Sequence, residues 1–178
     1  MSETPAKEIL AFWLSPSEPA RSHFLNLIRN FAARFDAPLF EPHLTLYGTD
    51  SEGEDPQKLL KRAVAGVKPC RLSIAGIGHS RNFTKTLFVQ FNPDAEVAAL
   101  SAKLCAASKA QTDYELNPHL SLIYKELPAA EKAAIAGRLT IPFSEVSFDS
   151  VKAVISPATI KSRKAVETWR VVGEAKLG

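Results

Sequence analysis

Two short stretches of this chain share one pattern, x-Pro-His-Leu-(Thr/Ser)-Leu. They read EPHLTL at 41–46 and NPHLSL at 117–122, which places the histidines His43 and His119 76 residues apart. Successive side chains of a β-strand point to opposite faces. Each stretch therefore predicts a strand whose leucines face the core, and whose histidine and hydroxyl residue project together from the other face.

The elements around the two stretches repeat as well. Alternating and apolar runs predict strands, and apolar residues at helical spacing predict helices. We expect strands over 8–14, 43–47, 70–78, 86–91, 117–124, 145–155 and 165–177. We expect helices over 18–35, 55–67, 92–108 and 128–137. The order β-α-β-α-β thus occurs twice, over approximately 8–78 and 86–155, and 165–177 is a closing strand.

The spacing of the repeat favours an internal duplication. From Leu14 to His43 is 29 residues, and from Phe91 to His119 is 28. Two copies are too few for a solenoid. We predict a single bilobal α+β domain over 1–178, in which two antiparallel-rich sheets face a central cleft. If the lobes face each other across a pseudo-twofold axis, the two histidine–hydroxyl pairs meet in that cleft.

Composition sets wider bounds. With 178 residues, of which 46% are hydrophobic, the chain can bury a substantial core. A net charge of +3 allows an anionic small substrate or a short nucleic acid, but is too small for a dedicated DNA-binding surface. Cys70 and Cys105 have no metal-like spacing and are expected to be free thiols.

The first ten residues lack the apolar core of a secretion signal, and no segment has the about 18 apolar residues of a membrane span. We expect a soluble, cytoplasmic monomer that does not associate with membranes.

The paired motifs suit metal-free phosphodiester chemistry. One neutral histidine can take a proton from water while the other, protonated, gives a proton to the leaving oxygen, and each transfer is typically worth about 100- to 10,000-fold in rate. Thr45 and Ser121 can donate hydrogen bonds to phosphate oxygens. A single histidine on a strand is more often structural, but two copies in one frame favour catalysis by His43 and His119. The other histidines, His23 and His79, lack the frame.

Other chemistries lack their signatures. A zinc site needs a third ligand, and no His-x-x-x-His, Cys-x-x-Cys or nearby carboxylate cluster accompanies the two histidines. No Gly-x-Ser-x-Gly elbow surrounds Ser121, and the sequence has no phosphate-binding glycine loop. We therefore expect neither a metal nor a cofactor.

These motifs resemble those of the two-histidine (2H) phosphoesterase superfamily, and in particular its cyclic phosphodiesterase branch. The similar stretches are AFWLSP, PHLTL, PHLSLIYKEL and VETWRVV, so the resemblance spans essentially the whole chain. It implies a bilobal α+β fold and metal-free hydrolysis of 2′,3′-cyclic nucleotides or ADP-ribose 1″,2″-cyclic phosphate. The implied products are the 2′-phosphate and the 1″-phosphate. His43, Thr45, His119 and Ser121 match the catalytic motif of that branch.

The resemblance also implies an aromatic pocket. Trp13 and Tyr124 match aromatic positions that line it, although both residue types also serve as core packing. Strict alternation along the strand puts Tyr124 on the leucine face, so it needs a bend at the strand end to reach the cleft. Cys70 and Cys105 do not match the disulfides of the plant members.

Two polar loops at equivalent places in the repeats are basic. They contain Arg81, Phe83 and Lys85 in 78–86, and Lys161, Arg163 and Lys164 in 156–165. Basic loops are usually only solvated. Beside a cleft that binds an anion, these loops would attract further phosphates of a nucleotide, and Phe83 would stack on a base.

Two alternatives remain open at this point. One is an RNA 2′,3′-cyclic phosphodiesterase, or 2′-5′ RNA ligase-like enzyme, acting on a short RNA end rather than on a small cyclic-phosphate nucleotide. Its larger substrate favours a longer basic track than a net charge of +3 suggests. The other is a non-catalytic nucleotide-binding module, which would not need two proton-transfer groups.

Overall fold

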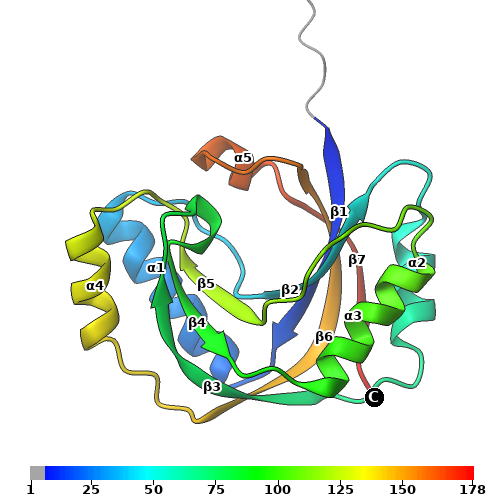
Figure 1. Ribbon diagram of the computed structural model, residues 1–178, viewed down its shortest axis with the longest axis horizontal. Coiled ribbons are helices and arrows are strands. Elements are labelled where there is room, and N and C mark those ends of the chain that lie inside the picture. Colours follow the sequence, from blue (N-terminus) through cyan, green and yellow to red (C-terminus); the bar gives the residue numbers. More distant parts are fainter. Residues whose placement is uncertain (1–6) are drawn as a thin grey trace, which may run out of the picture.

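The computed structural model describes residues 7–178 and consists of strands flanked by helices (Figure 1). The strands are β1 (Glu8–Pro16), β2 (Leu44–Asp50), β3 (Cys70–His79), β4 (Leu87–Phe91), β5 (His119–Ile123), β6 (Glu145–Pro157) and β7 (Arg170–Lys176). The helices are α1 (Ala20–Phe35), α2 (Pro56–Val64), the short 3₁₀ helix η1 (Phe83–Lys85), α3 (Ala95–Ala107), α4 (Ala129–Arg138) and α5 (Arg163–Glu167). The predicted α+β class is confirmed.

Helix boundaries follow local chemistry. Phe24, Ile28 and Phe31 fall at helical spacing and are the buried face of α1. At the start of α2, the Asp55 carboxylate accepts a hydrogen bond from the Lys58 backbone N–H, and Pro56 occupies the first turn, as the Asp-Pro pair predicts.

One expected element is wrong in part. The segment 165–177 was expected to be a single strand, but α5 (Arg163–Glu167) precedes β7 (Arg170–Lys176). Ser162 initiates this short helix because its hydroxyl accepts a hydrogen bond from the Ala165 backbone N–H. The bend that follows frees Trp169 from the strand ladder.

The strands form one sheet, in the order β1-β2-β5-β4-β3-β6-β7, in which all the pairings are antiparallel. A further pairing between β1 and β6 closes six of these strands into a ring. The antiparallel arrangement was predicted, but the two expected sheets are continuous. They are joined on one side through β3 and β6 and on the other through β2 and β5.

The two halves of this sheet mix the two sequence repeats. β1, β2, β6 and β7 are covered by α2 and α3, whereas β3, β4 and β5 are covered by α1 and α4 (Figure 1). Each half thus takes strands from both 8–78 and 86–155. The pairing of β1 with β6 over nine residue pairs holds the ends of the two repeats together.

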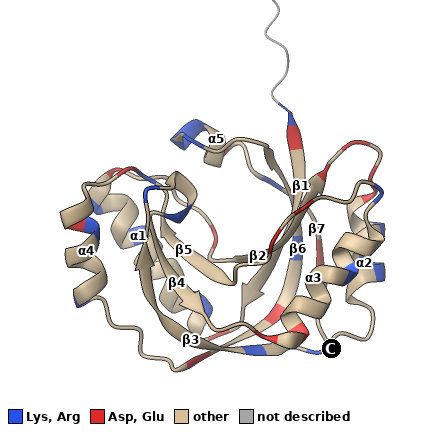
Figure 2. Ribbon diagram, viewed as in Figure 1, with Lys and Arg blue, Asp and Glu red and all other residues tan. Residues whose placement is uncertain are grey.

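The core lies between the strands and the covering helices. Phe12, Leu44, Leu46, Leu120 and Leu122 are essentially inaccessible to solvent, as predicted for the leucine faces of the two motifs. Charged residues lie mostly on helices and loops (Figure 2). Within residues 7–178, no helix is long and apolar enough to span a bilayer. Most of the N-terminal stretch judged for a secretion signal lies outside the described residues.

Candidate active site

The two motif strands meet at a single residue pair. β2 and β5 pair only through Leu44 and Leu120, the residues that directly follow the two histidines. In an antiparallel register centred on this pair, His43 lies across from Ser121, and His119 lies across from Thr45. Because leucines point to the core, these four polar residues face the opposite side together.

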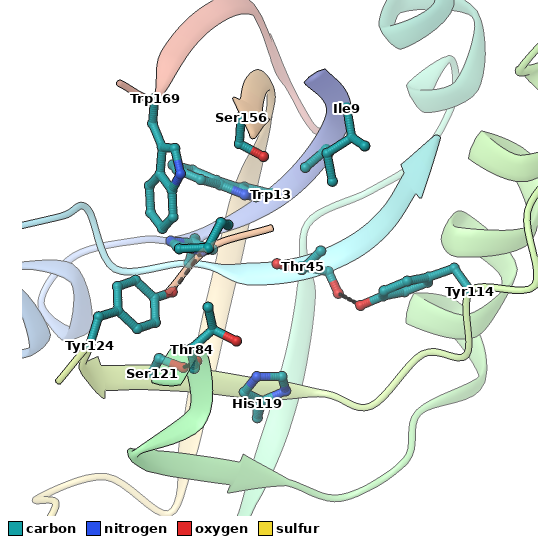
Figure 3. Close-up of a pocket in the computed structure, with 13 residues that line it drawn as sticks. Ile9, Trp13, Thr45, Thr84, Tyr114, His119, Ser121, Tyr124, Ser156 and Trp169 are labelled. Atoms are coloured by element: carbon teal, nitrogen blue, oxygen red, sulfur yellow. Dashed lines mark hydrogen bonds between the residues drawn. The ribbon is translucent and has the colours of Figure 1, made fainter. Parts of the chain in front are cut away.

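On that side lies a cavity of about 220 Å³. It is lined by Ile9, Ala11, Trp13, His43, Thr45, Thr84, Tyr114, His119, Ser121, Tyr124, Ser156, Ile160 and Trp169 (Figure 3). The structure therefore brings together all four motif residues and both predicted pocket aromatics, Trp13 and Tyr124. β5 ends at Ile123, so Tyr124 is free of the strand alternation and its ring reaches the cavity.

Both histidines are held in the same way. His43 Nδ1 lies 2.7 Å from the Glu41 carbonyl oxygen, and His119 Nδ1 lies 2.7 Å from the Asn117 carbonyl oxygen. A carbonyl only accepts, so each Nδ1 carries a proton and each neutral imidazole keeps its lone pair on Nε2. A residue that precedes proline is confined to extended conformations, which fixes the direction of these two carbonyls. This is a physical role for the prolines of the shared pattern.

His43 is enclosed by aromatic rings. Its imidazole stacks on Trp13 with 3.7 Å between centroids, and Trp169 packs edge-on at 6.0 Å. The Tyr124 hydroxyl lies 3.5 Å from Nε2. Burial lowers the pKa of His43 to about 4, and the nearby charges of His119 and Lys152 act in the same direction. His43 is therefore neutral in the free protein near pH 7.

His119 has a more open environment. Phe88 packs against its ring at a centroid distance of 5.6 Å, and the Lys85 ammonium lies 4.5 Å from the centre of the Phe88 ring. Burial lowers the pKa of His119, with a smaller contribution in the same direction from Lys85. The two histidines thus have different environments although their hydrogen bonds match.

The two hydroxyl residues also differ. Ser121 Oγ donates a 2.7 Å hydrogen bond to the Thr84 carbonyl oxygen. Among residues 7–178, the Thr45 hydroxyl has no hydrogen-bond partner, and the Thr45 carbonyl accepts from the Tyr114 hydroxyl at 3.0 Å (Figure 3). Thr45 is therefore free to donate into the cavity, whereas Ser121 must first release Thr84.

The basic side chains of the two predicted loops do not line the cavity, although Thr84 of one loop and Ser156 and Ile160 of the other do. Arg163 is bound to the Asp36 carboxylate and carbonyl at 2.6 and 2.7 Å, which directs its guanidinium to the end of α1. Arg81 and Lys161 are exposed. Phe83 is half-buried and faces Tyr124 at 6.4 Å, so it lies behind the pocket aromatics rather than at the cavity surface. Among the basic residues singled out, Lys85 acts on a motif histidine: its ammonium lies over the Phe88 ring, and its charge contributes to the lowered pKa of His119.

Several lining residues escaped the sequence analysis. Thr84 lies in the short helix η1, Ser156 lies near the end of β6, and Tyr114 and Trp169 lie in loops, so no periodicity marks them. Trp169 lies within the VETWRVV stretch, whose resemblance to the cyclic phosphodiesterase branch is the one sequence signal that points to this residue. No three His, Cys, Asp or Glu side chains in the described part of the chain are grouped so as to hold a metal ion.

Paired His-x-(Thr/Ser) strands facing one cavity in an antiparallel α+β fold define a phosphodiesterase of the two-histidine phosphoesterase superfamily. The family described as cyclic phosphodiesterase-like protein matches residues 9–177, and the chain belongs to that family.

Known proteins agree with this assignment. The chain is 24% identical over 179 residues to the cyclic phosphodiesterase of Arabidopsis thaliana, and the match covers 98% of each protein. The apo structure of E. coli LigT superposes with a TM-score of 0.58 at 16% identity, covering 97% of this chain and 98% of LigT. LigT complexed with 3′-AMP gives a TM-score of 0.56 at 16% identity, covering 98% and 99%. The structural matches show a shared fold.

Proposed function

We propose that this protein is a metal-independent cyclic phosphodiesterase. It hydrolyses 2′,3′-cyclic nucleotides, or ADP-ribose 1″,2″-cyclic phosphate, to the 2′-phosphate or the 1″-phosphate. The observation that carries the proposal is the matched pair of histidines. His43 and His119 line one cavity, each with Nδ1 bound to a carbonyl, which leaves the lone pair on Nε2 for proton transfer. At His43, the Tyr124 hydroxyl lies 3.5 Å from this nitrogen.

The chemistry needs only the groups in the cavity. One histidine takes a proton from water as the water oxygen bonds to phosphorus, and the other gives a proton to O3′ as the P–O3′ bond breaks. The products are a 2′-phosphate monoester and a free 3′ hydroxyl. Thr45 and Ser121 donate hydrogen bonds to the non-bridging oxygens, where charge is concentrated in the transition state.

The general acid must gain its proton on substrate binding. Burial lowers the pKa of both histidines in the free protein. An anionic phosphodiester in the cavity stabilises a protonated imidazole and so raises its pKa. Since the nearby charge of each histidine disfavours protonation of the other, one of the pair stays neutral as the base.

The walls of the cavity favour a small nucleotide. Its lining consists of aromatic, aliphatic and hydroxyl side chains besides the two histidines, and includes no lysine or arginine among the described residues. Such walls suit the uncharged nucleoside of a cyclic mononucleotide, with one anionic phosphate at the histidines. The similarity to a cyclic phosphodiesterase supports the same substrate class. We further propose a cytoplasmic monomer without a cofactor, as the sequence predicts.

A product-resolved assay tests the proposal. The protein is incubated with 2′,3′-cyclic AMP, ADP-ribose 1″,2″-cyclic phosphate or an RNA ending in a 2′,3′-cyclic phosphate, each with EDTA, and products are identified by phosphorus NMR. We expect turnover of a small substrate, with 2′-AMP from the cyclic nucleotide. Turnover of RNA alone would favour the RNA phosphodiesterase, and binding without turnover would indicate a nucleotide-binding module. Release of 3′-AMP would mean that the substrate binds in the opposite orientation.

A further inference from the structure

Each motif histidine is bound to a carbonyl whose own residue is held by a third side chain. Glu41 supplies the carbonyl for His43, and its carboxylate forms an ion pair with the Lys152 ammonium. Asn117 supplies the carbonyl for His119, and its side-chain oxygen accepts a 2.9 Å hydrogen bond from Gln90. The two arrangements are equivalent in connectivity, although one is ionic and the other neutral.

Lys152 is an unusual residue for its position. It lies on β6 directly opposite Trp13 of β1, so its side chain shares the cavity face of the sheet. The residue is only 8% exposed, and its ammonium bonds to Glu41. Burying an ammonium is unfavourable unless it is paired. The ion pair with Glu41 therefore stabilises the buried ammonium beside Trp13, the residue whose ring stacks on His43.

Gln90, on the neighbouring strand, holds Asn117, the residue whose carbonyl binds His119. It lies on β4 directly opposite His119 of β5. Besides Asn117, its amide N–H₂ group lies within hydrogen-bond distance of the Pro118 carbonyl oxygen at 2.9 Å and the Phe91 carbonyl oxygen at 3.2 Å. One side chain therefore binds both residues that precede His119.

We propose that Lys152, through Glu41, and Gln90, through Asn117, are positioning residues that each hold one histidine with Nε2 directed into the cavity. The kinetic part of this inference rests on the proposed function, whereas the orientation of the rings does not. Loss of either anchor frees one carbonyl, so one imidazole can rotate or exchange its Nδ1 proton to Nε2. A catalytic group displaced by about 1 Å can lose up to about a hundredfold in rate.

A purely electrostatic role for the ion pair makes a different prediction. The Lys152 charge lowers the pKa of His43 and the Glu41 charge raises it. His119 and the Tyr124 phenol are the other titratable groups that face this ring. If only charge mattered, Lys152→Met and Glu41→Gln would shift the pKa of His43 in opposite directions and leave its tautomer unchanged. Positioning predicts that both variants disturb the same tautomer.

The test is nitrogen NMR of the histidine rings in the full-length free protein, at mildly alkaline pH where the imidazoles are neutral. Two-bond proton–nitrogen correlations distinguish the Nδ1–H from the Nε2–H tautomer. We expect wild type to show Nδ1–H at both motif histidines. Lys152→Met and Glu41→Gln should mix the tautomers of His43 alone, and Gln90→Leu those of His119 alone. Lys152→Arg should retain the wild-type Nδ1–H tautomer of His43, because it keeps the cation that pairs with Glu41.

Steady-state kinetics with a cyclic phosphate that the protein hydrolyses provide the second measurement. We expect kcat to fall by about tenfold to a hundredfold in each anchor variant with KM little changed, and the double variant Lys152→Met/Glu41→Gln to fall no further than the worse single one. Lys176→Met is the matched control, since it removes a lysine from the β7–β6 ladder that pairs with Asp149 away from the cavity.

The outcomes separate the possibilities. An unchanged tautomer in Glu41→Gln and in Gln90→Leu would overturn the proposal, even if Lys152→Met does not fold. Equal disturbance of both histidines by one variant would also overturn it, because this would indicate general loosening of the fold. If the protein turns over no cyclic phosphate, the proposed function fails while the NMR result still decides the positioning role.

Discussion

The imidazole of His43 lies flat on the indole of Trp13, with 3.7 Å between the ring centroids and 11° between the planes. The stacking removes one face of the imidazole from solvent, and the carbonyl of Glu41 fixes its Nδ1. Ring packing and hydrogen bonding together therefore set where Nε2 points. Trp13 has a structural reason to be an aromatic residue that is independent of any contact with a nucleotide base.

Trp13→Phe tests this relationship. The smaller ring keeps an aromatic surface but leaves space beside the imidazole, so His43 can tilt out of line. We expect kcat to fall by about tenfold or more with a smaller change in KM, measured by steady-state kinetics. A rise in KM alone would instead assign Trp13 to substrate binding.

The unequal hydroxyl groups give a second prediction. The Thr45 hydroxyl is free to donate to a phosphate, whereas Ser121 donates to the Thr84 carbonyl. A hydrogen bond to a charged group is worth about 1.5–3 kcal/mol, so Thr45→Ala should lower kcat/KM by about tenfold to a hundredfold. Ser121→Ala should cost less. A larger loss for Ser121→Ala would mean that the serine exchanges partners when substrate binds.

The close packing behind His119 gives a third prediction, on stability and activity. A Cβ added to Gly78 lies 2.4 Å from Cζ of Phe88, the ring that packs against His119. Gly78→Ala must displace that ring, and overpacking of this kind typically costs about 1–3 kcal/mol. We expect lower stability in urea unfolding together with reduced kcat. Gly66 is a control site with a different cause of strain, because its φ is +72° and, apart from its chain neighbours, no atom of residues 7–178 lies within 4 Å of an added Cβ. Gly66→Ala should reduce stability without affecting kcat.

The buried His43 gives a fourth prediction, on stability and pH. Its pKa is lowered from 6.5 to about 4 in the folded protein, so the unfolded chain binds more protons between these values. Stability is therefore greatest above the unfolded pKa and is lost as pH falls toward the folded one, by about 3 kcal/mol in total. Urea unfolding across this range measures the loss. His43→Gln should show a shallower dependence, and an equally steep one would assign the loss to other groups.

Sequence reasoning reached the parts of the molecule that depend on local pattern. The alternation of His43, Leu44 and Thr45 predicted which side chains face the cavity, and the Asp55-Pro56 pair predicted the start of a helix. The spacing of the elements indicated the duplication, but it did not indicate how strands of the two repeats pair with each other. Pairing of β1 with β6 depends on contacts between the two ends of the chain, and no local signal encodes it.

The same distinction explains the residues that were missed. Thr84 and Tyr114 enter the cavity through hydrogen bonds to the motif strands, at Ser121 and Thr45. Arg163 was a candidate contact to a nucleotide phosphate because of its charge, but Asp36 at the end of α1 binds it instead. Charge and loop position alone do not fix the partner of a long side chain.

We propose that His43 and His119 are the two proton-transfer groups of a metal-free phosphodiesterase. The direct measurement is kcat for 2′,3′-cyclic AMP hydrolysis, with EDTA present, for wild type, His43→Ala and His119→Ala, each checked for folding by circular dichroism. We predict full wild-type activity in EDTA and a loss of about a hundredfold or more in each folded variant. Wild-type turnover in either folded variant, or loss of wild-type activity on chelation, would contradict it.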